Sequence, residues 1–321
     1  MQPPTWQQAR QAREPVARHL HRTPLIGSGT LSRLTGLSVH LKLENLQKTG
    51  SFKPRGALNH MVSLPPELRE RGVITISAGN HAQGVAFAAK VLGIRATVVM
   101  PASASRTKAE AAGDYGAEVI LHGDVTAAFQ KLHDLEKERG LHFVHPFDDD
   151  RIAAGQSTLG MEIIEDMPDV DAVLVGIGGG GLISGVAWAI KEMRPSARVI
   201  GVEPEGADVM FRSREEGKPV RLEKTSTIAD GLSAPFAGAL NFQMVQRYVD
   251  DLVRVSDSEI LSAMKLLFER CKTVAEPAGA AALAALLSGK VPLPAGTKVC
   301  CVVSGGNIGV DLLASLFAAS A

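Results

Sequence analysis

The chain has few cysteines, no excess of charge of either sign and no long hydrophobic run. Its cysteines are only Cys271, Cys300 and Cys301, and they form no CxxC pair. This odd number argues against a disulfide framework or a zinc site, so we expect reduced thiols and a cytoplasmic protein. Lysine plus arginine equals aspartate plus glutamate, at 34 each. No net field therefore attracts nucleic acid or an anionic membrane.

Membrane insertion and export are also not indicated. The longest apolar stretches, such as residues 172–177, fall well short of the roughly 18 residues that a membrane helix needs. The first 22 residues carry Arg10, Arg13 and Glu14 and lack the apolar segment of a signal peptide. With 45% hydrophobic residues the composition is that of a globular protein, and 321 residues are enough for two lobes. The balanced charge favours a small-molecule partner.

The apolar pattern predicts an α/β fold in which strands and helices alternate. Short branched runs predict buried strands at 39–43, 73–76, 96–100, 118–121, 172–175, 198–202 and 299–303. Helical spacing of apolar residues predicts helices at 108–115, 126–139, 182–193, 256–271 and 279–287. Such alternation is typical of parallel sheets with helices on both faces.

The order of these elements suggests two lobes. Residues 68–146 hold several strand and helix units of their own and are assigned to a small domain. Residues 1–67 and 147–321 would combine into a large domain, with a ligand cleft beyond the carboxyl ends of the strands.

One lysine stands in a setting that suits covalent chemistry. Lys53 follows Phe52 and lies shortly after the strand predicted at 39–43. An amine that attacks a carbonyl must be held near its target and be neutral, which partial burial favours. The alternative interpretation is a solvated surface lysine, which is what most lysines are.

A run of glycines predicts an anion site. Gly176 to Leu182 lie between a predicted strand and a predicted helix, where backbone amides and the helix dipole can hold a phosphate. The run also matches G-x-G-x-x-G, and Glu203 follows about 20 residues later, as in a dinucleotide-binding site. Four consecutive glycines suit a single phosphate better, although a tight structural turn would need some of them as well.

Two more segments place polar groups at strand ends. Ser77 to Gly84 combine small residues with hydrogen-bond donors at the start of a helix, which suits a carboxylate; an ordinary N-cap is the alternative. Ser304 follows the strand predicted at 299–303, where its hydroxyl could reach a heteroaromatic nitrogen or could serve as a cap.

Together these segments resemble the fold-type II pyridoxal 5'-phosphate (PLP) enzymes, the architecture of the tryptophan synthase β chain. The resemblance is closest to the threonine dehydratases and their relatives the serine racemases. It extends over almost the whole chain through Arg22–Leu25, Ala154–Thr158, Thr227–Gly231 and Ala275–Gly279. It implies a homo-oligomer and an α,β-elimination of water that converts L-threonine to 2-oxobutanoate and ammonia, and L-serine to pyruvate.

The resemblance also implies roles for individual residues. Lys53 would hold the cofactor as a Schiff base and later remove the Cα proton. The residues implied for cofactor binding are Phe52, Lys53, Asn80, Gly178, Gly179, Gly180, Gly181, Leu182 and Ser304. The residues implied for substrate binding are Ser77, Gly79, Asn80 and His81.

The sequence departs from the racemase pattern at two positions. Ala78 stands where racemases carry the serine that reprotonates the opposite face, and a methyl group cannot deliver a proton. Racemase-like members also bind Mg²⁺ or Ca²⁺, and of that site this sequence retains Glu203 and Ala207. Val209 stands in place of the last carboxylate ligand, which argues against a cation here. The chain also ends soon after Ser304, so we expect no C-terminal regulatory domain.

Alternatives remain open at this stage. Within the family they are a serine racemase and a dehydratase for another 3-hydroxy amino acid, such as 3-hydroxyaspartate. From another class, a nicotinamide-dependent (NAD) oxidoreductase would use the glycine run together with Glu203.

Overall fold

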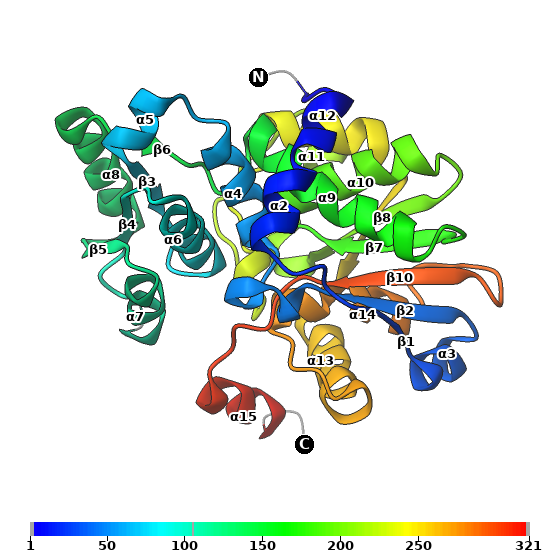
Figure 1. Ribbon diagram of the computed structural model, residues 1–321. Coiled ribbons are helices and arrows are strands. Elements are labelled where there is room, and N and C mark those ends of the chain that lie inside the picture. Colours follow the sequence, from blue (N-terminus) through cyan, green and yellow to red (C-terminus); the bar gives the residue numbers. More distant parts are fainter. Residues whose placement is uncertain (1–2, 105, 319–321) are drawn as a thin grey trace.

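The computed structural model describes residues 3–104 and 106–318. These residues form two sheets, each covered by helices (Figure 1). The strands of the larger sheet, in spatial order, are β1 (Leu25–Gly27), β2 (Ser38–Leu43), β10 (Lys298–Val303), β7 (Ala172–Gly176), β8 (Arg198–Pro204) and β9 (Asp251–Val255). The strands of the smaller sheet are β5 (Glu118–Leu121), β4 (Ala96–Met100), β3 (Val73–Ile76) and β6 (His142–Phe143). Strand β1 runs antiparallel to β2, and the other pairs are parallel.

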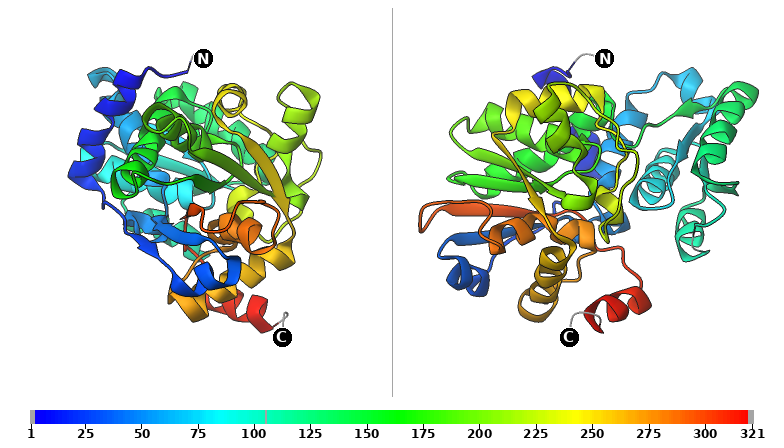
Figure 2. Two further views of the ribbon diagram at one scale, coloured as in Figure 1. Left: turned by 90° about the vertical axis from the view of Figure 1, so that its right-hand side faces the viewer. Right: turned by 180° about the vertical axis from the view of Figure 1, so that it is seen from behind.

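Helices cover both faces of the larger sheet (Figures 1 and 2). The helices on one face are α9 (Asp150–Asp166), α10 (Gly181–Met193) and α12 (Ala239–Tyr248). The helices on the other face are α3 (Gly29–Thr35), α13 (Asp257–Cys271) and α14 (Pro277–Leu287). Strand residues divide between the faces by alternation, as Val173 and Val175 face α10 whereas Leu174 faces α14. Burial on both faces explains why these strands are continuous apolar runs.

The smaller sheet is packed in the same way. Helices α6 (Asn80–Leu92) and α7 (Arg106–Asp114) cover the face that carries Val98 and Met100. Helix α8 (Val125–Arg139) covers the face that carries Ile74 and Val99. The four strands of this sheet lie inside the segment expected for the small domain.

Helix α4 (Lys53–Val62) lies where the two halves of the molecule meet. Its residues Ala57, Leu58 and Met61 pack with α6 and with the start of α9. The contact with α9 is close: a Cβ atom on Gly155 would lie 2.5 Å from the carbonyl oxygen of Arg55. Lys53 is the first residue of α4, so this packing fixes the base of its side chain.

Shorter helices complete the structure. They are α1 (Trp6–Gln11), α2 (Arg13–His19), η1 (Glu44–Leu46), η2 (Lys48–Gly50), α5 (Pro66–Arg71), η3 (Glu205–Ala207), α11 (Val209–Glu216), η4 (Asp230–Leu232) and α15 (Val310–Ala318). None of the helices in the described residues has the length and apolar character needed to span a bilayer.

The predicted strands and helices all form, with ends that shift by at most two residues where the prediction differs. Strands β1, β6 and β9 were not predicted. Strands β1 and β6 have three and two residues, too few for a pattern to stand out. Strand β9 lies at the edge of its sheet and is only partly buried, so it keeps charged residues at both Asp251 and Arg254.

Candidate active site

A cavity of about 440 Å³ lies between the two sheets and is lined by all four sequence segments. The predicted residues that line it are Phe52, Lys53, Ser77, Gly79, Asn80, His81, Gly178, Gly179, Gly180, Gly181, Leu182 and Ser304. They converge because β3, β7 and β10 end at Ile76, Gly176 and Val303, and the chain turns into the cavity after each of these ends.

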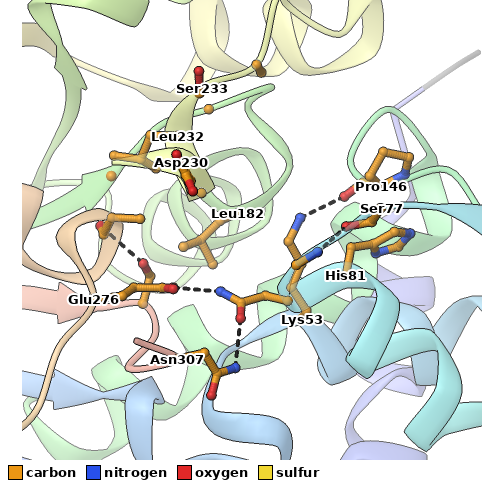
Figure 3. Close-up of a pocket in the computed structure, with 18 of the residues that line it drawn as sticks. Lys53, Ser77, His81, Pro146, Leu182, Asp230, Leu232, Ser233, Glu276 and Asn307 are labelled. Carbon is orange, nitrogen blue, oxygen red and sulfur yellow. Dashed lines mark hydrogen bonds between the residues drawn. The ribbon is translucent and has the colours of Figure 1, made fainter. Parts of the chain in front are cut away.

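The amine of Lys53 is held inside this cavity (Figure 3). Its Nζ donates a hydrogen bond to the carbonyl oxygen of Pro146 at 3.0 Å and lies 5.2 Å from the centre of the Phe52 ring. Burial lowers the pKa of Lys53 to about 8, although the nearby Glu276 carboxylate opposes the shift. At neutral pH roughly a tenth of such a lysine is uncharged, far more than for a solvated one, so it can act as a nucleophile.

The glycine run forms a turn between β7 and α10. Gly180 has φ of +95°, which favours glycine, and is the N-cap of α10. Within residues 3–104 and 106–318, no acceptor is hydrogen-bonded to the backbone amides of Gly178 to Leu182. These amides and the helix N-terminus could therefore hold an anion such as a phosphate group.

The ring of Phe147 covers one side of the glycine run. A Cβ atom on Gly179 would lie 2.5 Å from this ring, and one on Gly181 would lie 3.0 Å from Cβ of Phe147. The glycines are thus required by close packing as well as by backbone conformation. Phe147 could not be predicted as part of the site, because no local pattern links it to the glycines.

The segment from Ser77 to His81 lies at the N-terminus of α6 and offers a second place where an anion could bind. The hydroxyl of Ser77 accepts a hydrogen bond from the amide of Gly79, whereas the amides of Ala78, Asn80 and His81 have no acceptor among the described residues. Burial lowers the pKa of His81 well below its usual value, so the ring is neutral, and its Nε2 donates to the carbonyl of Val144 at 3.1 Å. The free amides and the helix dipole suit a carboxylate.

Asn80 is hydrogen-bonded to Glu276 and Asn307, two residues that were not predicted as part of the site. Its Nδ2 donates to Oε1 of Glu276 at 2.6 Å, and its Oδ1 accepts from Nδ2 of Asn307 at 2.7 Å (Figure 3). Since a carboxylate only accepts, these bonds fix the orientation of the Asn80 amide. Both partners lie in segments that carry the resemblance, which is the only signal that could have identified them.

Ser304 directly follows β10 and lines the cavity. It is 4% exposed, and its Oγ donates a long hydrogen bond of 3.4 Å to the carbonyl of Ala278. The hydroxyl is therefore free to turn toward a bound ring.

Glu203 does not take part in the cavity, and its surroundings do not fit a cation. Both of its carboxylate oxygens accept amide hydrogens, from Met210 at 2.8 Å and from Phe211 at 2.7 Å. Burial raises the pKa of Glu203 to about 8, which disfavours the charged form that a hard cation requires. The neighbouring Asp208 is paired with two arginines, and the described residues contain no cluster of three or more potential metal ligands.

Glu203 is equally unsuited to bind a nucleotide ribose. It is 1% exposed, and its oxygens are used by the start of α11. The nicotinamide-dependent alternative required Glu203 to bind the ribose, so this geometry argues against it.

Comparisons with known proteins agree with this geometry. The pattern of the family described as "Pyridoxal-phosphate dependent enzyme" matches residues 16–305. An L-threonine ammonia-lyase of Thermotoga maritima is 47% identical, over 96% of this chain and 77% of the relative. The L-threonine dehydratase catabolic TdcB of Escherichia coli is 43% identical, over 95% and 94%.

Solved structures give the same result. The structure of maize serine racemase superposes with a TM-score of 0.94 at 38% identity, covering 98% of this chain and 97% of that one. A threonine deaminase from tomato, Solanum lycopersicum, superposes with a TM-score of 0.92 at 34% identity, covering 99% and 89%. The predicted fold-type II architecture is therefore confirmed, and the NAD-dependent alternative is set aside. The chain belongs to the family of pyridoxal-phosphate-dependent enzymes, and pyridoxal phosphate is its cofactor.

Proposed function

We propose that the protein is an ammonia-lyase that converts L-threonine to 2-oxobutanoate and ammonia, and L-serine to pyruvate and ammonia. The observation that carries the proposal is the position of Lys53, a partly buried amine with a lowered pKa, in one cavity with two sets of backbone amides that have no acceptor among the described residues. The relatives named L-threonine ammonia-lyase and L-threonine dehydratase support this substrate.

The residues of the cavity fit the cofactor. The amides of Gly178 to Leu182 would hold its phosphate, and Lys53 would hold its aldehyde carbon. The ring would lie against Phe52, with the second N–H of the Asn80 amide facing the ring hydroxyl and Ser304 facing the ring nitrogen. When bound, the cofactor supplies an electron-poor ring that accepts the electron pair released when the substrate loses its Cα proton.

The chain itself binds the substrate and moves the proton. The segment that holds Ser77, Gly79, Asn80 and His81 would bind the substrate carboxylate through the free amides of Ala78, Asn80 and His81, and so would fix the direction of the Cα–H bond. The amine of Lys53 would accept the Cα proton. Its lowered pKa suits this role, because a base is most effective when its pKa lies near the working pH.

The products follow from the bonds that break. Loss of the Cα proton and of the β-hydroxyl removes one water from the substrate. The resulting enamine tautomerises to an imine, and hydrolysis takes one water back and releases ammonia with the 2-oxo acid.

The rival proposals within the family are a serine racemase and a dehydratase for 3-hydroxyaspartate. A racemase needs an acid on the face opposite Lys53, and Ala78, which lines the cavity at the position expected for it, cannot supply a proton. A 2-oxo acid assay on threonine, serine and 3-hydroxyaspartate, with Lys53→Ala as control, tests the proposal. Formation of 2-oxobutanoate that requires Lys53 supports it; no 2-oxo acid from threonine would contradict it.

We propose a cytoplasmic homo-oligomer with a large domain of residues 1–67 and 147–321 and a small domain of residues 68–146. The three thiols of the chain are unpaired, which suits a reducing compartment. Light scattering coupled to size-exclusion chromatography measures the oligomer, and a monomer at micromolar concentration would contradict this part.

A further inference from the structure

Asn241 lies behind the glycine run, outside the cavity. It belongs to the first turn of α12 and is fully buried. Its Nδ2 donates hydrogen bonds to the carbonyl oxygens of Gly179, at 2.9 Å, and of Phe147, at 3.1 Å. Because carbonyl oxygens only accept, the amide nitrogen must face both of them. The Oδ1 atom is buried and has no hydrogen-bond partner among the described residues, so the hydrogen bonds that hold the side chain come from its nitrogen.

We propose that Asn241 is a positioning residue for the phosphate of the cofactor, acting through the peptide between Gly179 and Gly180. A trans peptide is planar, so its C=O and N–H point in opposite directions. Asn241 and the amide of Gly238, at 3.2 Å, together hold the Gly179 carbonyl toward α12. The amide of Gly180 is thereby turned away from α12, toward the cavity that Gly180 lines.

The Asn241 side chain also holds the segment of Phe147, which packs against the glycine run. Its second bond goes to the carbonyl of Phe147, whose ring packs on Gly179. The next residue, Asp148, accepts hydrogen bonds from the amides of Ala239 and Leu240, both at 3.0 Å, and so holds the start of α12. The segment that carries the ring and the segment that carries the glycines are therefore joined at one amide nitrogen.

The glycines at this junction leave room for the Asn241 side chain but not for side chains of their own. A Cβ atom on Gly180 would lie 2.8 Å from Cβ of Asn241, and one on Gly238 would lie 2.7 Å from its Nδ2. Without the amide, the Gly179 carbonyl would keep only the longer bond from Gly238. A glycine peptide meets little steric resistance to rotation, so its N–H would lose its fixed direction.

The inference rests on the proposed cofactor site and predicts an effect on phosphate binding in particular. Cofactor-free enzyme is titrated with PLP and with pyridoxal, which lacks the phosphate, and the visible absorption is recorded. In Asn241→Leu we expect the PLP dissociation constant to rise about tenfold or more, the equivalent of one lost hydrogen bond, with pyridoxal binding changed less than about twofold. The phosphorus NMR signal of bound PLP should also shift or broaden.

Met244→Ala is the matched control. Met244 is buried in the same helix, so its truncation weakens the packing of α12 without touching the glycine run. It should lower stability and leave the ratio of PLP to pyridoxal affinity unchanged. Asn241→Ser gives the same test if the leucine variant does not fold.

The outcomes separate the two proposals. If the Asn241 variants keep the wild-type ratio of affinities, or if Met244→Ala changes that ratio equally, Asn241 is only structural and the inference is wrong. If the wild type binds neither compound, the proposed cofactor site fails and the inference fails with it.

Discussion

Arg55, two residues after Lys53, donates two hydrogen bonds to Glu162, from Nη1 to Oε1 at 2.7 Å and from Nη2 to Oε2 at 2.9 Å. Glu44 accepts two more hydrogen bonds from the same guanidinium, and Lys42 pairs with Glu162 from the other side. Arg55 and Lys42 are fully buried. This network joins β2, η1, α4 and α9 next to Lys53, the first residue of α4.

Glu162→Ala should destabilise the protein by about 3–5 kcal/mol, because it leaves two buried cations short of one negative charge. The free energy of unfolding in urea measures the effect. Glu165→Ala is the control on the same helix. Glu165 pairs with Arg13 and Arg22 at the surface, so its loss should cost less than about 1 kcal/mol. Equal losses in the two variants would contradict the role given to the buried network.

The lowered pKa of Lys53 predicts that stability depends on pH in the cofactor-free protein. Between pH 8, near the pKa of the folded state, and pH 10.5, the value for a solvated lysine, the unfolded chain binds one more proton than the folded one. Stability relative to Lys53→Met should therefore rise with pH over this window, by up to about 3 kcal/mol. Urea unfolding at several pH values measures the difference. A difference that stays constant from pH 7.5 to 10 would contradict the lowered pKa.

Gly180→Ala should greatly weaken cofactor binding. The new methyl group would meet Asn241 and the end of Met210 at 2.8 Å, in a backbone conformation with φ of +95° that L-residues rarely adopt. Gly217→Ala is the control, since Gly217 also has a positive φ, +68°, but open space around it. Fluorescence titration of the cofactor-free proteins with PLP should show weaker binding for the first variant only. Wild-type affinity in Gly180→Ala would contradict the packing described for the glycine run.

Ala78 predicts the stereochemical outcome with serine. The wild type should form pyruvate but no appreciable D-serine, because nothing at position 78 can reprotonate the opposite face. Ala78→Ser restores a hydroxyl at this point of the cavity wall and should produce measurable D-serine. Chiral chromatography after incubation with L-serine gives the answer. Appreciable D-serine from the wild type would refute the assignment.

The fold was largely predictable because buried parallel strands such as β3 and β4 are continuous apolar runs bounded by turns. The glycine run marked itself as an anion site within a short stretch of sequence, whereas for Lys53 the local sequence left a surface lysine open and only the resemblance placed it in the site, as the cavity lining now shows. Glu276, Asn307 and Asn241 could not be found in this way. Each acts on a residue at least 60 positions away in the chain, and only the folded structure brings them together.

The covalent bond between Lys53 and its cofactor tests the account most directly. Purified protein is incubated with PLP, reduced with borohydride, digested and examined by mass spectrometry. The account predicts a visible absorption band before reduction and, after it, a phosphopyridoxyl group on the Nζ atom of Lys53. A protein that stays colourless, or that carries the group on another lysine while Lys53 is unmodified, would contradict it.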